Sequence, residues 1–237
     1  MSELPSYVSG VFLATVAATF GFLYYGIKLA QKNKSSNHAI VASTFIMVWL
    51  FLIALLALYD FFLDFDAMPP RLFFVLPPPV IAIITLLSIK RSRTFLMQIP
   101  ITTLTYLHII RVPIEIVLWW LAGSQLVPYL LTFEGINYDI LSGISAPFVA
   151  IFMVGLRSKN RIGAILWNFI TLGLLINIVS HAVLAAPTPF QMFAFDQPNV
   201  AVFHFPFIWL PGFVVPAVLF AHMVSLMKLF AKEGELR

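Results

Sequence analysis

Seven long, uninterrupted apolar stretches constrain the fold of this chain more than any other feature. A helix that crosses the ~30 Å hydrocarbon core of a bilayer needs about 20 mostly apolar residues. The stretches that qualify occupy about residues 7–30, 39–63, 71–89, 100–122, 139–156, 162–185 and 207–229. Because their apolar residues are continuous and do not alternate with polar ones, helices are favoured over a barrel. The sequence therefore predicts an all-α integral membrane protein with a single seven-helix transmembrane domain.

The charges are few, and their positions predict an orientation. The 237 residues include 14 basic and 10 acidic side chains, well below the quarter or so of charged residues in a typical soluble domain. Twelve basic residues lie in every second connection and at the C-terminus: Lys28, Lys32, Lys34, Lys90, Arg91, Arg93, Arg157, Lys159, Arg161, Lys228, Lys232 and Arg237. The other connections hold Glu3, Asp60, Asp64, Asp66, Glu134, Asp139 and Asp196, with Arg71 as their one base. The positive-inside rule then places the N-terminus outside and the C-terminus in the cytoplasm.

Two short matches raise the hypothesis of an internal duplication. Residues 73–77 in the third stretch resemble residues 207–211 in the seventh, and residues 32–34 resemble residues 159–161. Stretches one to three and five to seven would then be parallel copies joined by the fourth, a 3+1+3 repeat. The alternative is a chance match between apolar segments.

The fourth stretch holds the densest group of ionisable side chains at membrane depth. His108, Arg111 and Glu115 fall on one helical face, and the last two can pair because they are four residues apart. Pro113 lies between them and removes one backbone hydrogen bond. Ionisable groups at this depth indicate a functional site, in which Arg111 would bind an anionic group or compensate charge. The alternative is a structural ion pair between helices.

Polar groups in the sixth and seventh stretches extend this candidate site. Asn177 and His181 are four residues apart in the sixth stretch, and His222 lies in the seventh. We expect these three to line one cavity with His108, Arg111 and Glu115, although an asparagine in a membrane helix also serves as a contact between helices. Pro211 and Gly212 predict a break or bend in the outer half of the last helix.

The histidines leave two cofactor hypotheses open. His108 and His222 have similar predicted depths, so that a haem could bind between them. His181 and His204 could join outer carboxylates in binding a divalent metal, although their spacing follows no known metal motif. The alternatives are hydrogen-bonded core histidines and a solvated acidic rim.

Two outer connections, residues 123–138 and 186–206, are rich in aromatic residues and proline. We expect them to pack over the bundle as a cap or to lie in the membrane interface. The acids and Asn137 at the end of the first connection are explained by capping of the following helix.

These observations predict a protein that transports or senses a small polar or amphipathic molecule in an intramembrane cavity, with anionic molecules among the candidates. A membrane-embedded haem or metal redox protein and a non-catalytic subunit of a membrane complex are the alternatives. No catalytic residue is assigned, and enzyme activity is the less favoured reading. The expected partners are the lipid bilayer and a small molecule, with no nucleic acid, because the net charge of +4 is explained by orientation. The expected location is the plasma membrane, or the inner membrane of a bacterium.

Overall fold

The protein is helical throughout the part of the chain that the structure, a computed structural model, describes, which comprises residues 4–31, 37–155 and 160–231. The α-helices are α1 (Ser6–Ala30), α2 (His38–Leu58), α3 (Pro77–Ser88), α4 (Lys90–Leu96), α5 (Ile101–Leu107), α6 (Arg111–Gly123), α7 (Ile140–Phe152), α8 (Arg161–Leu184) and α9 (Val215–Phe230). Short helical turns join them: η1 (Phe61–Leu63), η2 (Arg71–Phe74), η3 (His108–Ile110), η4 (Tyr129–Leu131), η5 (Ala201–Phe203) and the π-helical turn η6 (Leu210–Val214).

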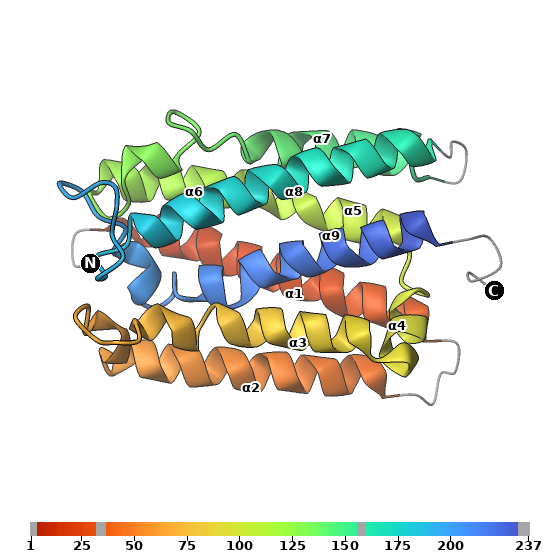
Figure 1. Cartoon of the computed structure of the whole chain (residues 1–237), viewed down its shortest axis with the longest axis horizontal. Coiled ribbons are helices and arrows are strands. Elements are labelled where there is room, and N and C mark those ends of the chain that lie inside the picture. Colours follow the sequence, from red (N-terminus) through yellow and green to blue (C-terminus); the bar gives the residue numbers. More distant parts are fainter. Residues whose placement is uncertain (1–3, 32–36, 156–159, 232–237) are drawn as a thin grey trace.

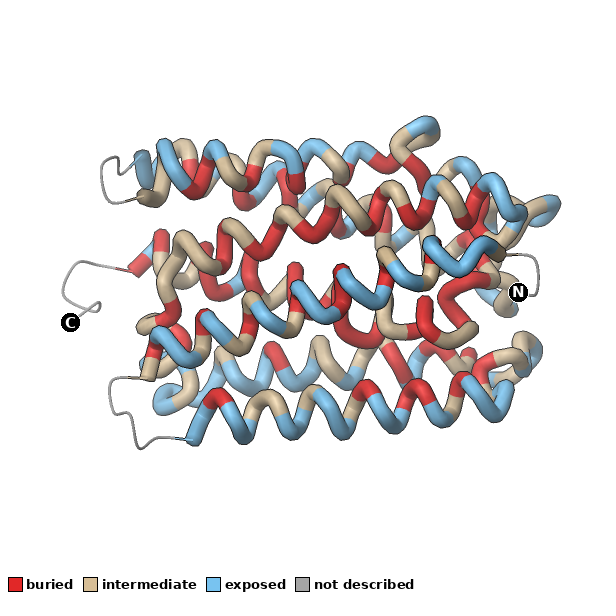
Figure 2. The backbone as a smooth tube through the Cα atoms, turned by 180° about the vertical axis from the view of Figure 1, so that it is seen from behind, coloured by how far each residue is buried: buried red, intermediate tan, exposed pale blue. Residues whose placement is uncertain are grey.

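The helices form an elongated bundle (Figure 1), in which α1 begins near one end and α9 ends near the other. The central helix α1 packs against α2, α5 and α6, while α9 packs against α5 and α8. The pair α2 and α3 lies on one side of this centre, and α7 and α8 lie on the other (Figure 1). Buried and exposed residues recur along the same helices, as the colours of the tube in Figure 2 show.

The outer surface of the bundle is apolar, which is the reverse of a soluble protein. Large side chains such as Phe45 and Ile162 are each 73% exposed, and exposed apolar residues recur along α2, α3, α7 and α8. A soluble protein rarely exposes so large a contiguous apolar surface. Six helical stretches in the described residues are long and apolar enough to cross a membrane, which indicates a multi-pass membrane protein.

The fifth predicted span differs most from expectation, so the count of seven spans is not confirmed. The helix expected over residues 139–156 is α7, which has 13 residues and is about 20 Å long at 1.5 Å per residue. Its N-terminal end lies in the middle of the bundle, and residues 124–139 run there from the end where α6 stops (Figure 1). Irregular backbone at this depth is tolerated where protein surrounds it or where it borders a cavity.

The other irregularities lie in the fourth and seventh stretches, which hold predicted polar groups. The fourth stretch changes from α-helix to the 3₁₀ turn η3 at His108–Ile110, just before α6, which contains Pro113. In the last stretch, the irregularity expected at Pro211 and Gly212 is confirmed as the π-helical turn η6. The indole of Trp49 donates to the carbonyl oxygen of Gly212 at 2.8 Å, so α2 satisfies a backbone group of this turn.

The outer connection 186–206 packs over the bundle as a cap, which is one of the two arrangements expected from the sequence. All three residues of η5 are buried. The side-chain amide of Gln197 donates to the carbonyl oxygens of Ala122 and Val127, at 3.0 and 2.6 Å. Asn199 donates to the carbonyl oxygen of Ala182 at 3.1 Å. These bonds fix the connection to the ends of α6 and α8.

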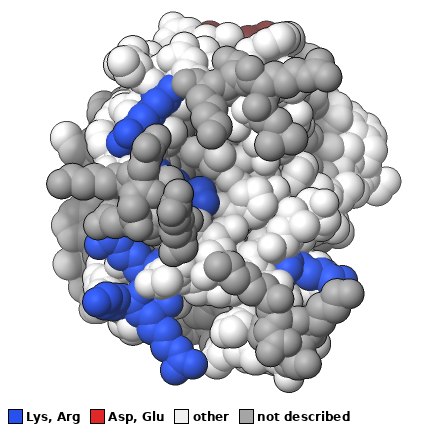
Figure 3. All heavy atoms as spheres, turned by 90° about the vertical axis from the view of Figure 1, so that its right-hand side faces the viewer, with Lys and Arg blue, Asp and Glu red and all other residues white. Residues whose placement is uncertain are grey.

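Lysine and arginine gather at the end of the bundle where α9 stops (Figure 3), in agreement with the charge asymmetry of the sequence. The described basic residues at the helix ends there are Lys28, Lys90, Arg91, Arg93, Arg161 and Lys228. The other six predicted for this side, Lys32, Lys34, Arg157, Lys159, Lys232 and Arg237, lie outside the described residues. The orientation relative to a membrane remains a prediction.

The 3+1+3 repeat also remains a prediction. Of its matched segments, residues 73–77 pass from the 3₁₀ turn η2 into α3, whereas residues 207–211 lead into the π-helical turn η6. The local structure of the two segments is therefore different, although each precedes a long helix. Most of the second matched pair lies outside the described residues.

Candidate functional site

A buried ion pair joins α6 to the N-terminal end of α7. Nε of Arg111 lies 2.7 Å from Oδ2 of Asp139, and the side chains are 3% and 6% exposed. Arg111 also donates to the carbonyl oxygen of Thr171 on α8, at 3.2 Å. Gly143 permits the close approach of α7, because a Cβ atom there would lie 2.7 Å from a methyl group of Val112.

This ion pair differs from the one that helical spacing predicted. Arg111 pairs with Asp139, and Glu115 instead accepts a hydrogen bond from Nδ2 of Asn137, at 2.6 Å between Nδ2 and Oε2. The reason is geometric. Asp139 stands at the start of a helix that begins in the middle of the bundle, so that its carboxylate reaches the guanidinium from the side.

Asn137 links the two carboxylates. Its Nδ2 also donates to the carbonyl oxygen of Leu131 at 3.0 Å, and its Oδ1 accepts from the backbone N–H of Asp139 at 3.0 Å. Oδ1 of Asp139 in turn accepts from the hydroxyl of Ser142, at 3.3 Å. We call Arg111, Glu115, Asn137 and Asp139 the carboxylate cluster. Two carboxylates and one guanidinium give it a formal charge of −1 when all are ionised.

A cavity of about 90 Å³ adjoins the carboxylate cluster. Three polar residues line it, namely Glu115, Asp139 and Asn199. The rest of the lining is apolar and comes from η2, α6, η4, α8, η5, η6 and the segments beside them: Leu72, Leu76, Ile114, Leu118, Leu131, Leu175, Ile178, Val179, Ala182, Val183, Val202, Leu210, Pro211 and Val215. Predominantly apolar walls with a few polar groups are typical of sites for small molecules.

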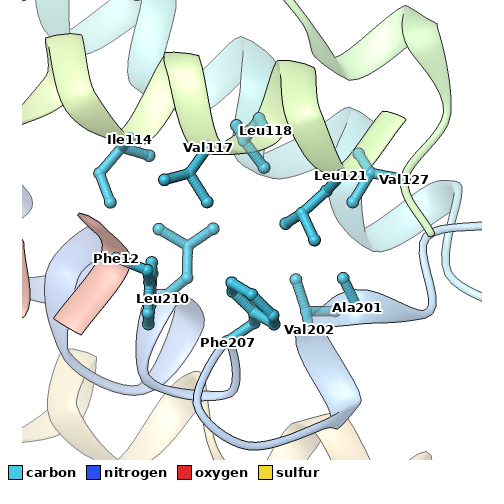
Figure 4. Close-up of a pocket in the computed structure, with 10 residues that line it drawn as sticks. All are labelled: Phe12, Ile114, Val117, Leu118, Leu121, Val127, Ala201, Val202, Phe207 and Leu210. Atoms are coloured by element: carbon cyan, nitrogen blue, oxygen red, sulfur yellow. The ribbon is translucent and has the colours of Figure 1, made fainter. Parts of the chain in front are cut away.

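A second, much smaller gap lies beside this cavity. Its volume is about 10 Å³, and side chains from α1, α6 and the outer connection surround it (Figure 4). Ile114, Leu118, Val202 and Leu210 border both spaces. The ten residues of its lining are apolar, so it offers a water molecule no hydrogen-bond partner. It is a packing gap, and the larger cavity is the candidate binding site.

Two predicted residues, His108 and His222, form a separate pair. Their ring centroids are 4.2 Å apart, and both side chains are fully buried. Nδ1 of His222 is 3.0 Å from Oδ1 of Asn168, whose Nδ2 donates to the carbonyl oxygen of Ala164. Oδ1 of Asn168 is therefore an acceptor, which assigns the donating N–H of His222 to Nδ1. Neither histidine is among the residues that line the cavity.

The histidine pair does not fit a haem between its rings. An iron atom bound by both side chains would have to lie between two ring nitrogens, with the porphyrin in the same gap. The rings are in contact at a centroid distance of 4.2 Å, and Trp167 packs edge-on against His108. No space for the macrocycle exists there.

The remaining predicted residues lie outside the cavity lining. Asn177 donates to the carbonyl oxygen of Ile136 at 3.3 Å and thereby supports the irregular segment before α7. His181 contacts the carbonyl oxygen of Asn177 through Nδ1 and stacks on Phe193. Burial lowers the pKa of His204, and Asp60 opposes this effect. In the described residues, no three His, Cys, Asp or Glu side chains converge as a metal site would require.

Sequence reasoning missed Asn137, Asp139 and Asn199 as parts of the site. The first two were interpreted as helix caps in an outer loop, and Asn199 lies in a proline-rich connection. One signal was available: the segment 129–139 is short and contains both polar and apolar residues, as expected for a chain that re-enters the bundle.

The fold and cavity together define a multi-pass, all-helical bundle with a polar cluster at mid-depth. Comparison of the chain with protein-family models, with curated proteins and with solved structures finds no significant match.

Proposed function

We propose that the protein binds a small amphipathic molecule inside the bundle and transports or senses it. The observation that carries this proposal is the cavity of about 90 Å³ between α6, α8 and η6, which has apolar walls and polar groups contributed by the carboxylate cluster. An apolar portion of the molecule would contact the leucine and valine side chains, and its polar group would face Glu115 and Asp139.

The depth of the site supports this function. Arg111 is the eleventh residue of the 23-residue stretch Ile101–Gly123, so the carboxylate cluster lies near the middle of a span. Buried ionisable groups at this depth cost several kcal/mol and are uncommon without a functional role. Transporters often place binding sites at the midplane, beside discontinuous helices. In this bundle α7 is a short helix preceded by irregular chain, and the π-helical turn η6 contributes Leu210 and Pro211 to the cavity lining.

The proposed topology follows the charges. Seven membrane-embedded segments, with α7 and the irregular chain before it as the fifth, would place the N-terminus outside and the C-terminus in the cytoplasm. The proposed location is the plasma membrane, or the inner membrane of a bacterium. Both ends of the cavity-lining helices would then face aqueous compartments.

Binding can be tested with octan-1-ol as a probe, using the purified protein in phosphatidylcholine nanodiscs. Ala182→Phe fills the cavity, and Ile176→Phe places the same side chain on the exposed face of α8 as the matched control. We expect octan-1-ol to raise the Tm of the wild type and of Ile176→Phe, and to leave that of Ala182→Phe unchanged. Equal shifts in all three proteins would refute the proposed site.

Transport and sensing can be separated by thiol labelling, because the chain contains no cysteine. Val179→Cys places one thiol in the cavity wall, and Ile176→Cys is the lipid-facing control on the same helix, which an impermeant reagent should not label. In proteoliposomes, a transporter would expose Cys at position 179 to an impermeant reagent from each face in turn. A sensor would expose it from one face only. Failure to label it from either face would contradict a site that opens to water.

A further inference from the structure

We infer that the molecule bound in the cavity is an amphipathic cation whose charged end is a hydrogen-bond donor, such as a primary alkylammonium. This inference rests on the proposed function and specifies its ligand class. It reverses the sequence-based expectation of an anionic ligand held by Arg111.

The first argument is that the polar groups around the cavity present acceptors. Nδ2 of Asn199 is used by the carbonyl oxygen of Ala182, and its Oδ1 is buried without a hydrogen-bond partner in the described part of the chain. The residue itself is 2% exposed. Within the described ranges, the side chain of Glu115 accepts a hydrogen bond through Oε2, which leaves Oε1 for a further donor. A ligand that donates hydrogen bonds matches these atoms, whereas a carboxylate or phosphate has none to give.

The second argument is that the cation of the cluster does not line the cavity. Arg111 is absent from the lining, while Glu115 and Asp139 belong to it. The guanidinium is held by Oδ2 of Asp139 and by the carbonyl oxygen of Thr171. An anion in the cavity would therefore meet the carboxylates before it met the arginine.

The third argument is charge balance. Arg111 compensates Asp139, and the carboxylate of Glu115 has the neutral amide of Asn137 as its hydrogen-bonded partner. An unpaired buried charge is costly, whereas a paired and hydrogen-bonded one is tolerated. A ligand cation beside Glu115 brings the formal charge of the carboxylate cluster and ligand together from −1 to zero.

The test compares three probes with the same eight-carbon chain, namely octylammonium, octan-1-ol and octanoate, at pH 7. The full-length protein is held in phosphatidylcholine nanodiscs, whose lipid is zwitterionic, and Tm is followed against probe concentration. We expect octylammonium to bind most tightly, octan-1-ol more weakly and octanoate not at all. The inference would be overturned if either octanoate or octan-1-ol bound as tightly as octylammonium. This comparison of probes uses the wild-type protein alone.

Two variants then locate the charge effect. Glu115→Gln keeps the size of the side chain and should weaken octylammonium binding about 10- to 100-fold, the range for a lost charge-assisted hydrogen bond, and should weaken octan-1-ol binding by a smaller factor. Glu134→Gln removes an exposed carboxylate from the outer segment and should alter neither probe. Unchanged octylammonium affinity in Glu115→Gln would overturn the inference. If every probe shifts the Tm of the wild type and of Ala182→Phe equally, the proposed function itself fails. A wrong ranking of probes that do bind in the cavity would overturn only the inference about the ligand.

Discussion

The ion pair between Arg111 and Asp139 predicts an unequal effect of its two members on stability. At 2.7 Å between Nε and Oδ2, the Coulomb attraction is about 6 kcal/mol for an effective dielectric constant of ~20. Desolvation offsets much of that attraction, so what matters is which charge each substitution leaves unpaired. Arg111→Gln leaves two buried carboxylates without a cation. Asp139→Asn leaves the guanidinium with Glu115, one helical turn away on α6.

We therefore expect Arg111→Gln to lower the free energy of unfolding by about 3–5 kcal/mol, the usual cost of breaking a buried pair. Asp139→Asn should lower the free energy of unfolding by about 1–3 kcal/mol, because the guanidinium of Arg111 then has Glu115 as a less well placed partner. In the double variant, only Glu115 remains charged. The loss of unfolding free energy in the double variant should be smaller than the sum of the two single losses by at least about 1 kcal/mol, because residues in contact are coupled.

The measurement is reversible unfolding by sodium dodecyl sulfate in mixed bicelles, followed by tryptophan fluorescence. The exposed pair of Arg71 and Asp64 is the control, with the same type of contact at 2.8 Å. Asp64→Asn should change stability by no more than about 1 kcal/mol. Additive costs at Arg111 and Asp139, or a larger cost for Asp139→Asn than for Arg111→Gln, would refute the charge assignment.

Three further predictions test the packing around the site by thermal unfolding. Gly143→Ala should cost about 1–3 kcal/mol, because its Cβ would overlap α6, whereas Gly173→Ala, with open space around it, should not destabilise the protein. Trp49→Phe should cost about 1 kcal/mol by removing the indole donor to η6, and an unchanged Tm would contradict this bond. His222→Leu should lower the free energy of unfolding by about 1–3 kcal/mol by leaving Oδ1 of Asn168 without its partner, and adding Asn168→Leu should recover part of this loss if the two residues act as a pair.

The apolar stretches were sufficient to predict most of the fold. The first, second and sixth predicted spans agree closely with α1, α2 and α8, because a continuous apolar run leaves few alternatives to a helix. Pro211 and Gly212 correctly indicated an irregular last helix. The fifth span was less predictable, since hydropathy gives the length of an apolar run but not the depth at which the helix starts.

The candidate site was predicted only in part, and the reason is the same in each case. Spacing along one helix can pair Arg111 with Glu115, but it cannot bring in Asp139, which belongs to another segment. Predicted depth placed His222 and His181 beside the same cavity, although the direction in which a side chain points decides its neighbours. Asn199 gave no signal, because an asparagine in a proline-rich connection is typical of a surface turn.

The irregular chain before α7 has a consequence for biosynthesis. Glu115 and Arg111 leave the ribosome before their partners, since the hydrogen bond from Asn137 spans 22 residues and the one to Thr171 spans 60. When α6 enters the bilayer, Arg111 and Glu115 can interact only with each other and with water. Asn137 and Asp139, which bind them separately in the finished bundle, have not yet been synthesised. The polar centre of the bundle is therefore completed late, after α8 has been synthesised. Truncation between α6 and α8 would leave a charged helix for cellular quality control to recognise.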